Sequence, residues 1–152
     1  VSGLNPTDVT VTEGDTFDYG THTVTDEEIV EFGRKYDPQP FHVDPEAAAD
    51  SMFGGLVASG WHVAALTNRL LMDALWTPLA LQGGRGVDDV RFRKPVRPGD
   101  DLSGTIEVAD LAEPDTDRGT VDVTFETTTR RNGEEPAFTA TILSIVGCRD
   151  AD

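Results

Sequence analysis

The stretch SGWHVAALTNRLLMDALW, residues 59 to 76, decides the fold that this sequence predicts. Ser59 is a typical N-cap for a helix that begins at Gly60 and ends at about Trp76. The apolar residues of this segment leave only a narrow polar stripe, at Thr67, Asn68, Arg69 and Asp73. A helix that is apolar on nearly every side is buried on nearly every side. We therefore expect a central helix roughly 24 Å long, at about 1.5 Å per residue, which matches a strand of about seven residues.

The chain after this helix changes to an alternation of apolar and polar residues, which is typical of strands with one wet face. Val121, Val123 and Phe125 show it most clearly, because polar residues separate them. Asn132-Gly133 is a strong hairpin signal between two of these segments. A further strand is expected over 16–24, before the helix. A four-strand antiparallel meander and that first strand predict an α+β fold whose sheet wraps around the central helix. The expected meander strands are residues 86–96, 101–111, 120–130 and 136–146.

Helix signals also lie between the first strand and the central helix. Thr25 and Glu28 have the spacing of a capping box, which predicts a helix to about Tyr36. The two prolines that follow Asp37 must end this helix. Asp44-Pro45 then predicts a short helix with an aspartate cap and a proline at its first position.

The chain has 152 residues and a formal net charge of −16 at pH 7. This length suits one domain, and we expect an N-terminal arm over 1–15 and a domain over 16–148. The negative charge argues against nucleic acid and against an anionic membrane surface as partners. No run is apolar enough to span a membrane and the first residues lack the features of a signal peptide, so we expect a cytoplasmic protein. The single cysteine, Cys148, excludes an internal disulfide framework and a Cys-rich metal site.

The cations are nearly all arginines, because Lys35 and Lys94 are the only lysines. Carboxylates are spread along the whole chain instead of forming one acidic tail. Such a distribution keeps a protein soluble by repulsion and suits a cytoplasm rich in screening salt. We therefore expect a salt-adapted, halophilic protein, with an ordinary acidic mesophilic protein as the alternative.

Candidate catalytic residues lie in the segment YDPQPFHVD, residues 36 to 44. Asp37 and His42 stand five residues apart on a loop that its prolines stiffen, so fewer backbone states must be frozen to hold both side chains. An ionised Asp and a neutral His can each accept a proton from one water molecule, and can thereby orient and deprotonate it. The residues alone also allow a structural turn, in which Asp37 caps backbone amides and His42 fills space.

The start of the predicted central helix offers a second chemical group. Unpaired amides at a helix N-terminus, with the helix dipole, favour a developing negative charge. Gly60 lets a ligand approach its amide closely, so an acyl carbonyl placed there could become a stabilised enolate. Ser59 can serve as an ordinary N-cap at the same time. His62 is expected to be a packed or interfacial histidine and not a third catalytic group.

Three motifs in combination resemble one known family. They are DPQPFHVD at 37–44, FGGLVASG at 53–60 and RFRKPVRPGD at 91–100. Over roughly residues 16–146 the chain resembles the MaoC-like acyl dehydratases, the (R)-specific enoyl-CoA hydratase branch of the hot dog folds. The resemblance implies a single α+β hot dog domain, in which an antiparallel sheet wraps around a long central helix.

The family pattern runs Asp, any residue, Asn, Pro, an aliphatic residue and His. Asp37 and His42 match its catalytic positions, and Gly60 matches its backbone oxyanion donor. Gln39 replaces the Asn and Phe41 replaces the aliphatic residue, so these two substitutions are expected to affect the acyl-chain preference. Together with Ser59, they are the expected substrate contacts near the catalytic pair.

The resemblance implies a hydro-lyase that reversibly hydrates trans-2-enoyl thioesters to 3-hydroxyacyl thioesters. Asp37 and His42 would hold the water, whose oxygen adds to C3, and the same pair would return a proton to C2. The thioester oxygen would lie on the Gly60 amide. No metal and no redox cofactor is expected, and coenzyme A enters only as part of the acyl-CoA substrate.

The phosphates of coenzyme A would require local cations on this acidic chain. Arg91, Arg93 and Lys94 lie in the third motif. In a strand, Arg91 and Arg93 share one face, and an arginine pair suits phosphate. An ordinary solvated strand face with balancing cations is the equally weighted alternative.

Two other functions remain open at this point. A hot dog acyl-CoA thioesterase would hydrolyse the same thioester. A resemblance to such an enzyme implies a carboxylate in the first half of the central helix, and positions 60–72 contain none. A non-catalytic acyl-CoA binding module would keep the pocket and lose the Asp37 and His42 pair. Whatever the function, one sheet around one helix leaves an edge strand and a helix flank exposed, so we expect a twofold homodimer or a higher homo-oligomer.

Overall fold

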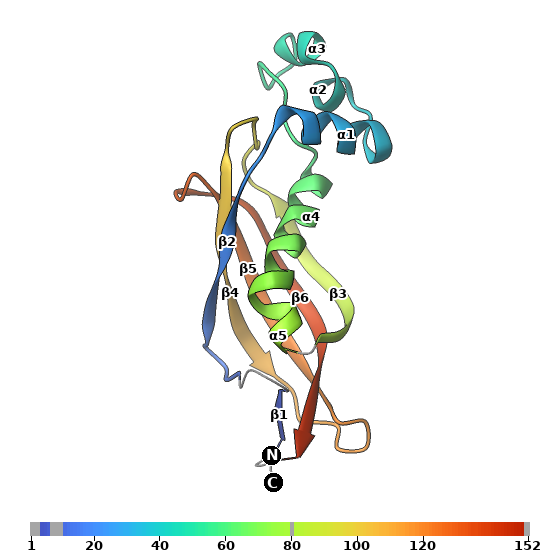
Figure 1. Ribbon diagram of the computed structural model, residues 1–152, viewed down its shortest axis with the longest axis vertical. Helices are drawn as coiled ribbons and strands as arrows, with labels where there is room; N and C mark the ends of the chain where they lie inside the picture. The colour runs from blue at the N-terminus through green and yellow to red at the C-terminus, as the bar shows by residue number, and fades with distance from the viewer. Residues whose placement is uncertain (1–3, 7–10, 80, 151–152) are drawn as a thin grey trace.

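The computed structural model describes residues 4–6, 11–79 and 81–150, and Figure 1 shows how its elements are arranged. The helical elements are α1 (Asp26–Tyr36), α2 (Pro40–Val43), α3 (Pro45–Ala49), α4 (Gly60–Leu71), the π-helical turn η1 (Met72–Trp76) and α5 (Thr77–Leu79). The strands are β1 (Leu4–Pro6), β2 (Thr16–Thr23), β3 (Leu81–Phe92), β4 (Asp101–Leu111), β5 (Thr120–Arg131) and β6 (Glu135–Asp150). Helix α4 lies along one face of the sheet. Helices α1, α2 and α3 lie together beyond one end of the sheet, near the start of α4 (Figure 1).

The sheet is antiparallel and has the order β2-β4-β5-β6-β3, with β1 paired to the C-terminal end of β6. The predicted meander is correct for β4, β5 and β6 and wrong for β3, which pairs with β6 at the far edge and not with β4. The alternation of apolar and polar residues identifies a strand but does not show which strand it pairs with, which explains this error. Strand β3 also begins at Leu81, earlier than predicted. Its first half contains three glycines, which are uncommon in strands and hide the alternation of apolar and polar residues.

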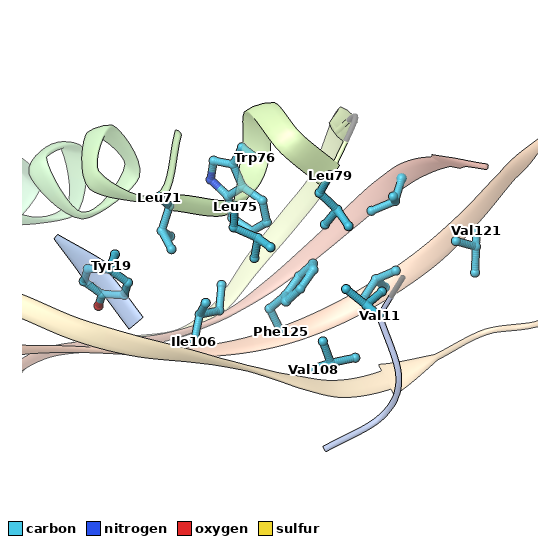
Figure 2. Packing of buried hydrophobic residues seen from close by; sticks show 12 residues of the cluster. Val11, Tyr19, Leu71, Leu75, Trp76, Leu79, Ile106, Val108, Val121 and Phe125 are labelled. Atoms are coloured by element: carbon cyan, nitrogen blue, oxygen red, sulfur yellow. The ribbon is translucent and has the colours of Figure 1, made fainter. Parts of the chain in front are cut away.

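The main core lies between α4, η1 and the inner face of the sheet (Figure 2). Phe125 is fully buried there beneath Leu75 and Trp76, and its ring meets the Trp76 ring edge to face with centroids 5.1 Å apart. The predicted inward face of β5 is confirmed, because Val121 and Val123 are buried with Phe125. This packing fixes the helix over the sheet and so fixes where its first turn lies.

A second, polar contact holds the middle of α4. The Tyr19 cluster consists of Tyr19, Thr67, Thr127 and Thr129. The hydroxyl of Tyr19 donates to the Thr128 carbonyl at 2.7 Å and lies 2.8 Å from the Thr129 hydroxyl, which lies 2.5 Å from that of Thr67. Burial, the largest effect, raises the pKa of Tyr19, although the threonine hydrogen bonds oppose it, so the phenol remains a donor.

The central helix differs from its prediction in two ways. Thr67, a residue of the predicted polar stripe, is buried, and Trp61, one of the apolar residues predicted to be buried, is 61% exposed. One sheet covers only one side of a helix, so the opposite side of α4 stays open in a single chain. The helix is regular only to Leu71 and then widens into η1. Pro78 explains the change, because its ring would clash with the Ala74 carbonyl in a regular helix.

The predicted turns and caps are confirmed where the sequence signals are strong. Asn132 and Gly133 have positive φ angles of 53° and 72°, as a type I′ hairpin turn requires. The Thr25 side chain accepts from the Glu28 amide, and Asp44 caps α3.

The expected arm over 1–15 contacts the domain in its described part. Val11 is buried in the main core, and β1 pairs with β6. Residues 1–3 and 7–10 lie outside the described residues, so the division into an arm and a domain over 16–148 stays a prediction. Among the helices that the structure describes, none is both long and apolar enough to cross a membrane.

Candidate functional site

The candidate site forms where the end of α1, the short helix α2 and the start of α4 meet. Asp37 is the C-cap of α1, and its amide donates to the Gly33 carbonyl at 2.9 Å. Pro40 begins α2, so the segment predicted as a stiffened loop contains one helical turn, for which proline at the first position is well suited. This turn carries the imidazole of His42 back toward the Asp37 carboxylate.

The two predicted catalytic side chains lie close together. His42 Nε2 is 3.4 Å from Asp37 Oδ2. His42 Nδ1 lies 2.6 Å from the carbonyl oxygen of Val57, to which an Nδ1–H donates. In the neutral ring this leaves the lone pair on Nε2. Two acceptor groups therefore face one point, and one water molecule with two O–H groups can satisfy both.

Ser59 connects this pair to the first turn of α4. Its hydroxyl donates to Asp37 Oδ2 at 2.7 Å and accepts from the Trp61 amide at 3.3 Å. The predicted cap is thus confirmed, and the same hydroxyl also orients the carboxylate. Ser59 is only 1% exposed, so it is placed to position Asp37, and its predicted substrate contact stays a prediction.

The Gly60 amide is the second group at this end of α4. Among the residues that the structure describes, it has no hydrogen-bond acceptor, as the first amides of a helix lack internal partners. The ring of Phe92 lies against Gly60, since a Cβ atom built on this residue would come within 2.6 Å of the ring. The missing side chain therefore allows Phe92 to rest on the helix backbone.

A pocket of about 390 Å³, which we call the site pocket, contains His42 and Gly60. The ring of Phe41 also lines it, whereas the side chain of Gln39 is exposed and lies outside its lining. Gln39 contributes backbone contacts instead, because its carbonyl accepts from the His42 amide at 2.9 Å. The predicted roles of both side chains in substrate binding stay predictions.

Two of the three predicted cations lie at this pocket. Arg93 and Lys94 line it, and Arg91 does not. Arg93 Nε donates to the Thr139 hydroxyl at 2.8 Å, and Arg91 on β3 is the cross-strand partner of Thr139 on β6. Both arginines therefore lie next to Thr139. Lys94 lies 3.7 Å from a carboxylate oxygen of Glu135. All three cations are exposed and accessible to an anion.

Gly33 is a site-forming residue that the sequence analysis missed. A Cβ atom at this buried position of α1 would lie 3.0 Å from both the Cβ and the carbonyl oxygen of His42. The glycine thus lets α2 approach α1 closely. A glycine in the interior of a predicted helix was the available signal, because it costs about 1 kcal/mol relative to alanine and needs a packing reason.

A histidine cluster next to the site was also missed. Glu28 Oε1 lies 2.9 Å from His22 Nε2 and 3.3 Å from His62 Nε2, which connects β2, α1 and α4. His62 is buried and stacks on Phe32, with centroids 4.8 Å apart. Burial, the largest effect, lowers the pKa of His62, Glu28 opposes the shift, and His22 and His42 add to it. Its Nδ1 atom is buried without a partner in the described chain.

A second pocket of about 610 Å³, which we call the apolar pocket, lies between α4 and the strands β3 and β6. Trp61, Leu71 and Trp76 line its helix side, and Val90 and Phe138 line its sheet side. Its walls suit a hydrocarbon more than a charged group. Within the described residues, no group of three or more His, Cys, Asp or Glu side chains has the arrangement of a metal site.

Comparisons with known proteins agree with this architecture. A family model described as a MaoC like domain matches residues 8–131. The 3-hydroxyacyl-thioester dehydratase Z of Mycobacterium tuberculosis is 35% identical over 122 residues, which cover 78% of this chain and 79% of that protein. The uncharacterized protein YdeM of Bacillus subtilis is 30% identical over 116 residues, which cover 76% of this chain and 82% of that protein.

Solved structures show the same fold. A MaoC-like dehydratase from Rhodospirillum rubrum has a TM-score of 0.81 at 38% identity, covering 91% of this chain and 94% of that chain. An (R)-hydratase from Pseudomonas aeruginosa has a TM-score of 0.74 at 22% identity, covering 95% and 88%. The predicted α+β hot dog fold is confirmed.

Proposed function

Because the chain belongs to the MaoC-like domain family and has relatives among the dehydratases, we propose that it reversibly hydrates trans-2-enoyl thioesters to 3-hydroxyacyl thioesters. One observation carries this proposal: the Asp37 carboxylate and the His42 Nε2 lone pair face the same point, 3.4 Å apart. Two acceptors that converge in this way suit a water molecule, which offers one proton to each.

The reaction follows from these two acceptors. As the water oxygen bonds to C3, one water proton passes to the pair, and the electrons of the C2–C3 double bond move toward the carbonyl. The same pair then returns a proton to C2, so that the elements of one water molecule are added and both side chains are restored. Ser59 keeps the carboxylate in place throughout by its 2.7 Å hydrogen bond.

The Gly60 amide stabilises the intermediate charge in this scheme. The thioester oxygen becomes an enolate oxygen when C3 is attacked, and a fixed N–H donor with the dipole of α4 favours that charge. The amide has no partner of its own within the described chain, so it needs no rearrangement to serve as a donor. No step in this scheme requires a metal or a redox group, and the expectation that none is used stays a prediction.

An assay with crotonyl-CoA tests the proposed reaction. We expect a loss of the ultraviolet absorbance of the conjugated enoyl thioester, with no release of free thiol. Release of thiol would identify a thioesterase, and binding without either change would identify a binding module. Either result would overturn the proposal. The thioesterase is less well supported, because α4 (Gly60–Leu71) carries no carboxylate.

We assign Arg93 and Lys94 to the phosphates of the carrier, since both cations line the site pocket on a strongly acidic chain. Charge reversal by Arg93→Glu should raise the KM for an acyl-CoA several-fold and leave kcat nearly unchanged. An unchanged KM would leave these residues as ordinary surface cations.

We propose a homodimer as the working assembly. Among the strands that the structure describes, β3 pairs only with β6 and so lies at an edge of the sheet, and Val87 on this strand and Met72 beside α4 are exposed apolar residues. A second copy is the simplest cover for such an edge. A monomer in light scattering, measured in molar salt and in dilute buffer, would contradict it. The cytoplasmic location and the adaptation to salt stay predictions from composition.

A further inference from the structure

The ring of Phe92 stands between the site pocket and the apolar pocket. Phe92 lines the site pocket, whereas its two aromatic neighbours, Trp61 and Phe138, line the apolar pocket. The ring centroids of Phe92 and Trp61 are 5.4 Å apart, and those of Phe92 and Phe138 are 6.1 Å apart. The three rings therefore form a wall, and Phe92 is the member of the wall that faces the catalytic side.

This wall lies at the reacting end of the proposed substrate. The Phe92 ring is packed directly on Gly60, whose amide is assigned to the thioester oxygen. The first carbons of an acyl chain must leave that point within a few ångströms of the ring. Two cations, Arg93 and Lys94, belong to the lining of the site pocket, so a long hydrocarbon chain is better accommodated in a further, apolar space.

The apolar pocket offers that space. It has about 610 Å³, compared with about 390 Å³ for the site pocket, and its lining includes Ala64, Leu71 and Ile142. Each methylene group that leaves water for such a lining adds to the favourable free energy of binding. The gain grows with chain length, so access to this pocket decides how strongly long chains are preferred.

Phe92 is the part of the wall that can turn aside. It is the last residue of β3 and is 50% exposed, whereas Phe138 is 4% exposed and packed in the core. Rotation of the half-exposed Phe92 ring therefore disturbs less buried packing than movement of Phe138 would. Of the three rings in the wall, that of Phe92 is therefore the one whose movement can join the two pockets.

We propose that Phe92 determines the acyl-chain length of the substrate, by closing the apolar pocket to short-chain thioesters and opening it when a long unbranched chain displaces the ring. This inference rests on the proposed function for the position of the thioester. It adds a specificity-determining residue outside the catalytic pair.

The test compares Phe92→Ala with the unaltered protein on trans-2-enoyl-CoAs of four and twelve carbons. We expect the ratio of kcat/KM for the twelve-carbon chain to that for the four-carbon chain to rise about tenfold or more. Phe53→Ala is the matched control, because Phe53 is an aromatic residue of the site pocket that does not line the apolar pocket. Its ratio should change less than twofold. Phe92→Leu, which keeps an apolar contact on Gly60, replaces the alanine variant if the latter unfolds at a lower temperature.

A binding measurement separates this inference from the proposed reaction. Calorimetry with saturated butanoyl-CoA and dodecanoyl-CoA, which cannot be hydrated, should show the same rise in relative affinity in Phe92→Ala. If the protein hydrates enoyl-CoAs and neither ratio changes, the role of Phe92 is wrong and the reaction stands. If no enoyl-CoA is hydrated and the affinity ratio still rises, the reaction is wrong and the role of Phe92 stands. If no acyl-CoA binds, both are overturned.

Discussion

Two groups of polar side chains contact the same helix, α4, and they differ in how completely their hydrogen bonds are satisfied. In the middle of the helix, every hydroxyl of the Tyr19 cluster has a partner. At its start, the Gly60 amide and the His62 Nδ1 atom have none in the described chain, and His42 Nε2 faces another acceptor. Satisfied buried groups hold a structure together, whereas unsatisfied ones mark the place where a ligand completes the hydrogen bonds.

The largest effect is expected where the Tyr19 cluster meets the sheet. A Cβ atom at Gly104 would clash with the Thr128 carbonyl and the Tyr19 hydroxyl. Gly104→Ala should therefore lower the free energy of unfolding by about 3 kcal/mol or more, as measured by urea denaturation. Gly20→Ala is the control, because nothing lies within 4 Å of its added Cβ atom. Equal stability of the two variants would show that this contact does not fix the helix.

Removal of the Tyr19 hydroxyl should have the next largest effect. Tyr19→Phe leaves the Thr128 carbonyl and the Thr129 hydroxyl with one partner fewer, which should lower the free energy of unfolding by about 1 to 2 kcal/mol. Turnover of enoyl-CoA should change less than twofold. Tyr36→Phe at an exposed ring is the control for stability. Lost turnover at unchanged stability would place Tyr19 in the chemistry and remove the contrast between the two regions.

Gly33→Ala tests the other region through the approach of α2 to α1. The added Cβ atom meets the backbone oxygen of His42 at 3.0 Å, so α2 must shift. Turnover should fall about tenfold, equivalent to about 1.4 kcal/mol in the barrier. Stability should change by less than about 1 kcal/mol, because alanine favours the helix. Turnover equal to that of the unaltered protein would show that the distance between His42 and Asp37 tolerates this shift.

The smallest expected effect is on the free energy of unfolding at acidic pH. Burial lowers the pKa of His62 in the folded chain, so the unfolded chain binds this proton more readily. The stability from the neutral ring is complete above the unfolded pKa of about 6.5 and is lost as the pH falls below it. From pH 7.5 to 5.5, the unaltered protein should lose up to about 1 kcal/mol more unfolding free energy than His62→Gln in urea titrations. His22, Glu28 and His42, which face His62, are unchanged in both proteins. Equal losses would show that His62 does not sense pH.

Sequence reasoning predicted the parts of the fold that depend on local signals. The capping residues Thr25 and Ser59 and the turn at Asn132 are examples, because each follows from a few neighbouring residues. The pairing of β3 with β6 and the open side of α4 could not be predicted in this way, since both depend on which surfaces meet after folding. Periodicity identifies an apolar face but not the element that covers it.

The candidate site shows the same limit. The sequence correctly predicted that the side chains of Asp37 and His42 lie close together, because the prolines restrict the segment between them. The contact of His42 with the Val57 carbonyl has no local sequence signal, and Gly33 has only an indirect one, a glycine in the interior of a helix. Phe92 is a further case, because its contact with Gly60 joins residues that are far apart in the sequence.

The most direct test of the central claim is the hydration rate of Asp37→Asn and His42→Gln, two substitutions that nearly keep the shape of each side chain. If the pair activates water, each variant should lose at least about a hundredfold in kcat, with little change in KM and with the unfolding midpoint retained. Turnover within a few-fold of the unaltered protein in both variants would contradict the account.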